Sequence, residues 1–126
     1  MQRMLFDKKS DLNPEMPDGD GNCFEVHANF LIDLSVRNPK SLPDYTLCHG
    51  VPTGQGPIEG IEFPHCWLEF KESIVIDISN GNKVNMPRAS YYHLGNINSS
   101  RVKRYAWDEV KKNILKHKHY GPWEKL

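Results

Sequence analysis

Residues 62–79, EFPHCWLEFKESIVIDIS, contain two runs of aromatic and β-branched residues on either side of the polar pair Lys71-Glu72. Both runs have the composition of strands, and we predict strands over about 62–70 and 73–79. Strands joined by so short a turn pair as an antiparallel hairpin. The hairpin therefore predicts an antiparallel sheet, around which the other elements pack.

One register of this hairpin would bring His65 and Asp77 together. Facing residues of an antiparallel pair have a constant sum of residue numbers, so a turn centred on Lys71 places these two side chains opposite each other. Their Cβ atoms would then be about 4.5 to 5.5 Å apart, and the carboxylate would reach the ring. A two-residue turn would instead put them on opposite faces of the sheet. The contact therefore depends on the length of the turn.

Helices are predicted before and after the hairpin. Apolar residues recur at helical spacing over about 22–36, and an amphipathic pattern runs from Tyr105 to near Tyr120. The first helix has Cys23 in its opening turn, where free amide groups favour a thiolate over a thiol. We predict an α+β domain in which a helix carrying Cys23 packs on an antiparallel sheet, with an amphipathic helix at the C-terminal end.

Shorter elements are predicted between these. A strand over 45–51 precedes a glycine and proline loop at 52–57, which is too irregular for secondary structure. Residues 83–86 form a short strand before Pro87, and a short helix lies within 88–97. These elements extend the sheet and add a second helix to pack on it.

Size and charge limit the class of protein. The chain has 126 residues and a mass of 14.6 kDa, which suits a single domain over 1–126. Because 16 basic residues balance 16 acidic ones, no net field attracts nucleic acid or an anionic membrane. We interpret the basic residues between Arg101 and Lys118 as a solvated helix face. The domain is divided into an irregular lead-in at 1–21, a core that carries the predicted chemistry at 22–81 and a helical part at 82–126.

The sequence also bears on compartment and cofactors. It has no run of 18 apolar residues and no secretory leader, so we expect a cytoplasmic protein that does not bind membranes. Its three cysteines lack CxxC spacing and are expected to be reduced thiols. Cys48-His49 and His65-Cys66 are adjacent pairs on strands that point to opposite faces, so neither readily chelates one ion. We expect no metal and no cofactor.

Cys23, His65 and Asp77 supply, in this order, the three residue types of an activated thiol. A thiol with a pKa of about 8.5 is mostly protonated at neutral pH. A nucleophilic cysteine therefore needs a histidine to take its proton and a third group to hold that histidine. The alternative for Cys23 is a buried cysteine without reactivity, since free cysteines are among the most buried residues.

Two short motifs carry a family resemblance. The segment 65–69, His-Cys-Trp-Leu-Glu, resembles the His-Ala-Trp-Val-Glu segment of many papain-like proteins of the transglutaminase-like arrangement. The segment 76–79, Ile-Asp-Ile-Ser, resembles their strand that ends in Asp-Pro-Ser or Asp-Pro-Thr. This resemblance covers about 22–81. The whole chain also resembles small phage and bacterial proteins, through the landmarks His49-Gly50, Gly54-Gln55-Gly56-Pro57, Tyr91-Tyr92 and Gly121-Pro122-Trp123.

The resemblance implies a small papain-like fold and a role for each residue of the trio. Cys23 would be the nucleophile, His65 the general base and acid, and Asp77 the group that fixes the histidine. The backbone amide of Cys23 would be one oxyanion donor. Papain-like enzymes usually supply a second from a glutamine shortly before the cysteine, which this chain lacks, so Asn22 or Gln55 is expected to replace it.

Three further residues are expected around the histidine. Trp67 and Glu69 have the parity of His65 in the predicted strand, and we predict that they line a cleft on the same face. His27 lies one turn after Cys23 on the predicted helix and is placed in the same cleft. Packing in the core is the alternative for Trp67. Were His27 to contact the thiol itself, His65 would be structural.

The sequence thus predicts a thiol-dependent hydrolase or acyltransferase that acts on a peptide or amide bond of a protein or peptide substrate. The alternative is a binding or inhibitor protein without catalysis, such as one encoded by a phage, built on a papain-like scaffold. The order of the trio favours the enzyme, whereas the missing upstream glutamine favours the binding protein. The sequence does not determine an oligomeric state.

Overall fold

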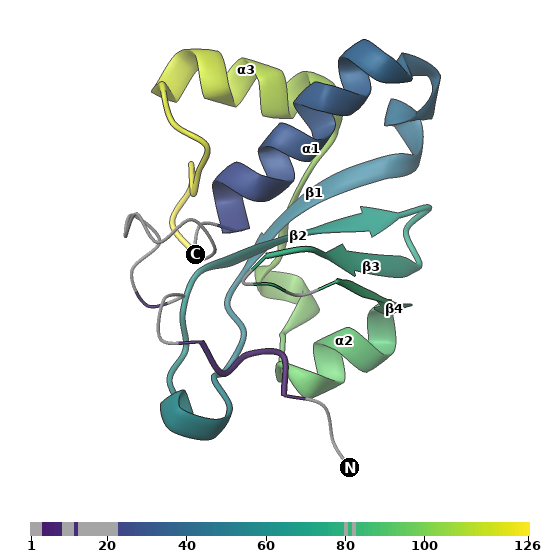
Figure 1. The fold of residues 1–126 in the computed structure, drawn as a ribbon. Helices are drawn as coiled ribbons and strands as arrows, with labels where there is room; N and C mark the ends of the chain where they lie inside the picture. Colours follow the sequence, from purple (N-terminus) through teal and green to yellow (C-terminus); the bar gives the residue numbers. More distant parts are fainter. Residues whose placement is uncertain (1–3, 9–11, 13–22, 80, 82) are drawn as a thin grey trace.

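A five-stranded antiparallel sheet with the strand order β4-β3-β2-β1-β5 forms the centre of the protein (Figure 1). The computed structural model describes residues 4–8, 12, 23–79, 81 and 83–126. The strands, in chain order, are β1 Tyr45–Gly50, β2 His65–Phe70, β3 Ile74–Asp77, β4 Val84–Pro87 and β5 Lys103–Tyr105.

The hairpin of β2 and β3 is present, and its turn is longer than predicted. Pairing runs from Phe70 opposite Ile74 to Leu68 opposite Ile76, so three residues, 71–73, make the turn. The first two of them have left-handed φ angles of 51° and 58°. Side chains other than glycine, asparagine and aspartate rarely adopt this conformation, so composition signalled the position of the turn but not its three-residue form.

The register that would set His65 directly opposite Asp77 is two positions away from the one observed. The turn is centred on Glu72 rather than Lys71, and the observed register, when extended, sets Trp67 rather than His65 opposite Asp77. A shift of two residues preserves the face on which each side chain lies. His65 and Asp77 are thus diagonal neighbours on one face, a separation that long or ring side chains can still span.

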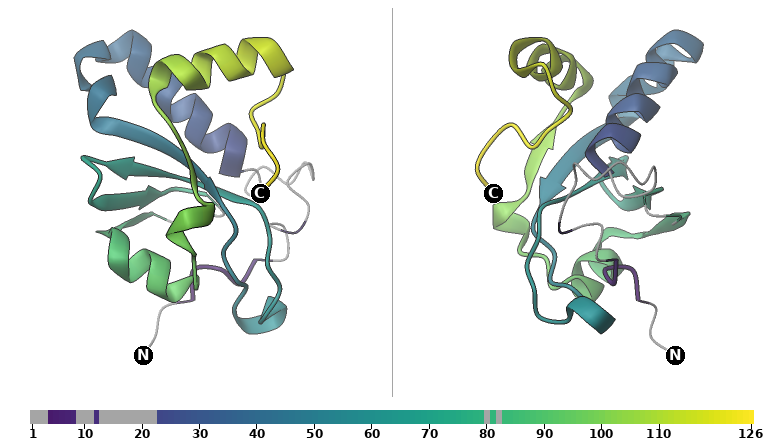
Figure 2. Two further views of the ribbon diagram at one scale, coloured as in Figure 1. Left: turned by 180° about the vertical axis from the view of Figure 1, so that it is seen from behind. Right: turned by 60° about the vertical axis from the view of Figure 1, so that its left-hand side comes forward.

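Three α-helices cover the two faces of the sheet. In the views of Figures 1 and 2, α1 and α3 lie over one face and α2 lies against the other. Apolar repeats at helical spacing account for α1 and α3, as predicted from the sequence. None of the described helices is both long and apolar enough to span a membrane. The helices are α1 Cys23–Arg37, α2 Arg88–Leu94 and α3 Trp107–His117, with 3₁₀ turns η2 Pro39–Asp44, η3 Gly56–Ile58 and η4 Ser99–Arg101.

Each face of the sheet has its own apolar core, because successive side chains of a strand point to opposite faces. Under α1 and α3, the core includes Phe24, Leu31, Leu47, Cys66 and Leu68. On the opposite face, next to α2, it includes Phe6, Cys48, Trp67, Val75 and Tyr91.

Two sequence expectations are revised by this arrangement. The basic stretch read as a helix face contains the short edge strand β5, which pairs with β1 through Tyr105 opposite Leu47. Three residues are too few for an alternating pattern, and lysine and arginine are common on edge strands. Within the lead-in, Leu5 and Phe6 are buried in the core, 2% and 0% exposed. Residues 9–11 and 13–22 lie outside the described part.

Gly50 is expected to be intolerant of a side chain. A Cβ at this position would overlap the Trp67 indole, so Gly50→Ala should lower the free energy of unfolding by about 1 to 3 kcal/mol in urea titrations. The same substitution in a Trp67→Phe background should cost less, since the smaller ring makes room. An equal cost in both backgrounds would show that the overlap is not its cause.

Candidate functional site

Side chains of α1 occupy the end of the hairpin where β2 and β3 separate. The pairing of β2 with β3 ends at Leu68 and Ile76. If it continued, Cys66 and Ile78 would be the next pair to exchange backbone hydrogen bonds. Their amides bond to the helix instead. The Cys66 N–H donates to Cys23 Sγ at 3.2 Å, and the Ile78 N–H donates to His27 Nε2 at 3.0 Å. The helix thus replaces strand hydrogen bonds with a thiol and an imidazole.

His65 lies between the thiol and the carboxylate. Its Nε2 is 2.9 Å from Asp77 Oδ2, and hydrogen bonding and charge interaction with Cys23 both act on the same ring. Asp77 occupies Nε2, so Nδ1 is the other ring nitrogen. The ring is fixed by edge contacts with Phe6 and Phe63, at centroid distances of 5.7 and 5.8 Å.

Asp77 is a fully buried carboxylate that has a donor for each oxygen. Oδ2 accepts from His65 and from the Tyr91 hydroxyl at 2.7 Å, and Oδ1 accepts from the backbone and hydroxyl of Ser79 at 3.0 and 2.6 Å. Burial alone would raise the pKa of Asp77, but the charge and hydrogen bond of His65 hold it well below its usual range. The group is therefore a fixed negative charge.

The neighbours of His65 favour its protonated form. Burial alone would lower the pKa of His65, but the charges of Cys23 and Asp77 and the hydrogen bonds to both raise it well above its usual value. At neutral pH the ring is then an imidazolium between a carboxylate and a thiol group. The Cys23 sulfur therefore lies beside a positively charged ring and accepts the hydrogen bond of the Cys66 amide.

His27 has a different role from His65. Its Nδ1 lies 2.8 Å from the Cys23 carbonyl oxygen, which only accepts, and its Nε2 faces the Ile78 amide, which only donates. These partners fix a neutral tautomer with the proton on Nδ1. Burial lowers the pKa of His27 despite the nearby Asp77 charge. Both nitrogens are thus committed to backbone groups, which leaves His65 as the histidine available to the thiol.

The side chains expected to line a cleft are buried. Trp67, Glu69 and His27 are 0%, 1% and 0% exposed, so none of them borders open solvent. Trp67 belongs to the core on the α2 face and donates its indole N–H to Glu69 at 3.1 Å. Glu69 also accepts from the Tyr92 hydroxyl, and Arg88 and Arg104 lie 3.4 and 3.5 Å from its other oxygen. The paired charges explain why a carboxylate is buried here.

Of the two expected oxyanion donors, Gln55 lies within the described residues. Gln55 holds the N-terminal segment: its Oε1 accepts from the Leu5 and Phe6 amides at 2.9 and 3.1 Å. These bonds use the oxygen of the side chain and leave its amino group as the only donor for another partner. Asn22 lies outside the described residues.

The sequence did not signal several groups of this site. Tyr91 and Ser79 hold Asp77, yet Tyr91 comes from α2, and no spacing in the chain links this helix to the end of β3. The Cys66 amide faces the thiol only because the β2–β3 ladder opens. These contacts depend on tertiary structure, which periodicity does not specify.

A buried histidine next to the site was also missed. His49 is 0% exposed and lies directly across from Cys66, among the rings of Phe24, Tyr105 and Trp123 at 4.8 to 5.0 Å. Neither of its ring nitrogens has a hydrogen-bond partner among the residues described. Burial lowers the pKa of His49 to about 3, so the ring is neutral.

The C-terminal segment approaches this histidine closely. Gly121 lies against His49 and Phe24, so a Cβ there would come within 2.7 Å of the imidazole and 3.0 Å of the phenyl ring. Figure 1 shows the same segment running down beside the start of α1. The last residues of the chain thus cover the helix turn that carries Cys23.

In the described part of the chain, no group of three or more histidine, cysteine, aspartate or glutamate side chains is arranged to hold a metal ion. Comparisons with protein-family models, with curated proteins and with solved structures find no match for this chain. The arrangement of its own side chains is therefore the basis for a function.

His49 is expected to make the fold sensitive to acid. The unfolded histidine binds a proton below about pH 6.5, but the folded one stays neutral until about pH 3. Its contribution to stability is thus complete above pH 6.5 and declines as the pH falls toward 3, by about 3 kcal/mol between pH 7 and pH 4.5. His49→Leu should lack this decline in urea unfolding.

The exposed His93 on α2 gives the matched control, His93→Gln, which should lose stability with acid as the wild type does. If His49→Leu loses as much stability as the wild type over this range, the burial of a neutral ring is not the cause.

Proposed function

We propose that this protein is a thiol-dependent hydrolase or acyltransferase that acts on a peptide or amide bond, with Cys23 as the nucleophile. The observation that carries the proposal is the His65–Asp77 hydrogen bond of 2.9 Å, on a ring that also interacts with the Cys23 sulfur. A thiol, a histidine and a carboxylate in series are the parts of an activated nucleophile. The burial and charge of Asp77 keep the histidine oriented and protonated.

The proposed reaction passes through a thioester. The Cys23 thiolate attacks the carbonyl carbon, a carbon–sulfur bond forms, and the carbonyl electron pair moves to oxygen. When this intermediate collapses, the carbon–nitrogen bond breaks and His65 gives its proton to the departing amine. Water, or an acceptor amine in a transferase, then attacks the thioester while His65 takes its proton. The second tetrahedral intermediate then collapses, the carbon–sulfur bond breaks, the acyl product leaves, and the thiolate and the imidazolium are restored.

A papain-like scaffold of the transglutaminase-like arrangement belongs to the same proposal. It is supported by the helix that starts at Cys23, by the strand that starts at His65 and by the next strand, which ends at Asp77. The side chains of the last two lie on one face, as the motifs at 65–69 and 76–79 imply. The coarser architecture, an α+β domain with a five-stranded antiparallel sheet, does not depend on this assignment.

One observation favours a second candidate function, a binding or inhibitor protein without catalysis. Cys23, His65 and Asp77 are 2%, 0% and 0% exposed, so a substrate has no direct access to the sulfur in the described conformation. A scaffold that retains the trio only for packing would have this property. The reactivity of the thiol separates the two functions.

Thiol labelling tests the proposal. At about pH 6, where an unperturbed thiol is almost wholly protonated, iodoacetamide should modify Cys23 at least tenfold faster than Cys48 or Cys66. The site of modification is read by peptide mass spectrometry. Cys48 and Cys66 are both 0% exposed, so they control for burial. His65→Ala should remove the advantage of Cys23, whereas His27→Gln should retain much of it. Equal labelling of all three thiols would favour the binding protein.

The Asp77 carboxylate should set the pH at which the Cys23 thiol reacts. Asp77→Asn removes a charge that raises the pKa of His65, so the ring should lose its proton at lower pH and no longer stabilise a Cys23 thiolate at about pH 6. We expect the rate of Cys23 labelling to fall at about pH 6 and its pH profile to move upward by about one unit or more. Asp33→Asn, at an exposed ion pair of α1, should leave the profile in place. An unmoved profile in folded Asp77→Asn would remove Asp77 from the mechanism.

A further inference from the structure

A pocket of about 560 Å³ lies at the end of the sheet opposite to the thiol. Its volume is in the range of sites that hold small organic ligands. Tyr45, where β1 begins, is part of its wall, whereas Gly50, where β1 ends, faces His65. Five residues of strand separate these ends by about 17 Å. The lining consists of Pro39, Leu42, Pro43, Tyr45, Thr46, Glu72, Ala106, Trp107 and Asp108.

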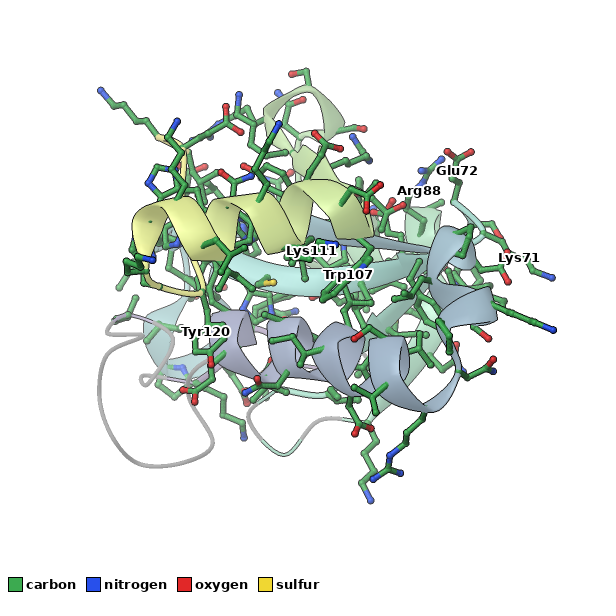
Figure 3. The ribbon with its side chains drawn as sticks, turned by 90° about the horizontal axis from the view of Figure 1, so that it is seen from above. Lys71, Glu72, Arg88, Trp107, Lys111 and Tyr120 are labelled. Carbon is green, nitrogen blue, oxygen red and sulfur yellow. The ribbon has the colours of Figure 1, made fainter. Side chains whose placement is uncertain are left out.

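Rigid elements supply the two kinds of group that recognise an organic cation. Tyr45 and Trp107 provide aromatic surface, and Glu72 and Asp108 are the charged residues of the lining, both negative. Figure 3 shows Trp107 between α3 and α1, and Glu72 on the hairpin turn. The left-handed backbone of the turn fixes the position of Glu72, and the first turn of α3 fixes that of Asp108.

The two carboxylates are free to bind a ligand. Glu72 and Asp108 are exposed, and neither side chain has a hydrogen-bond or ion-pair partner among the residues that the structure describes. Arg88 also lies near the hairpin turn in Figure 3, but its guanidinium is 3.4 Å from Glu69. Two unpaired negative charges at one pocket attract a positive group.

An aromatic ring next to the pocket already contacts a cation of this chain. Tyr45 packs between Phe30 and Phe70, with centroid distances of 5.5 and 5.1 Å. The ammonium group of Lys71 lies over the Phe70 ring, 5.3 Å from its centroid. This contact shows that a cation is accommodated on an aromatic face at this end of the sheet.

We propose that this pocket binds an arginine side chain of a partner protein. The planar guanidinium would stack on Trp107 or Tyr45 and donate to Glu72 and Asp108, and the apolar stem would pack on Leu42 and the prolines. Arginine suits such a pocket better than lysine, because it stacks on rings and forms paired hydrogen bonds with carboxylates. The site is separate from the thiol chemistry and would hold the partner at the opposite end of the sheet.

The test is a titration of the full-length protein with the peptide acetyl-Gly-Arg-Gly-amide, followed by ¹H–¹⁵N NMR. Saturable shifts are expected at the Trp107 indole and the Thr46 and Glu72 amides. The matched peptide with norleucine in place of arginine should shift these signals little. Glu72→Gln combined with Asp108→Asn should weaken binding about tenfold, and Trp107→Leu should weaken it severalfold.

Two controls keep this test independent of the proposed enzyme. Glu59→Gln, at an exposed carboxylate outside the pocket, should leave the affinity unchanged, and so should Cys23→Ser at the far end of the sheet. The proposal is overturned if the norleucine peptide binds equally well. It is also overturned if the double variant, with its fold retained, binds arginine as tightly as the wild type. Neither result would alter the labelling of Cys23.

Discussion

The buried charge of Asp77 is the constraint on which the arrangement of this protein depends. A carboxylate away from water is very unstable unless donors and positive charge surround it. Here the donors come from β2 through His65, from α2 through Tyr91 and from the chain beyond β3 through Ser79. This one carboxylate therefore connects β2, α2 and the segment after β3, and displacement of a donor would weaken the compensation of its charge.

The sequence allowed the architecture to be predicted better than its contacts. The hairpin, the helix that starts at Cys23 and the amphipathic α3 follow from local composition and periodicity, which reflect burial along one element. The register of the hairpin was not predictable, because Lys71 and Glu72 adopt left-handed φ angles that their residue types rarely take. The register differed by an even number of residues, so His65 and Asp77 still lie on one face of the sheet.

The sequence allowed the residues of the candidate site to be predicted, but not their burial or their hydrogen-bond partners. Order along the chain indicated Cys23, His65 and Asp77, but nothing in that order indicated that all three would be buried. The donors around Asp77, the neutral tautomer of His27 and the enclosed His49 each require knowledge of which elements pack together. Burial decides the protonation of His27 and His49, and neighbouring charges decide that of His65 and Asp77. Both are properties of the whole fold.

The close contact at Gly121 links the C-terminal segment to the first turn of α1. Since the segment rests on Phe24, the neighbour of Cys23 in the chain, a pull or a bulky group attached after Trp123 acts on the first turn of α1. The C-terminal segment is then mechanically linked to the turn that carries the Cys23 sulfur. A fluorophore placed at the C-terminus would sense opening around that turn, and a large C-terminal fusion would perturb it.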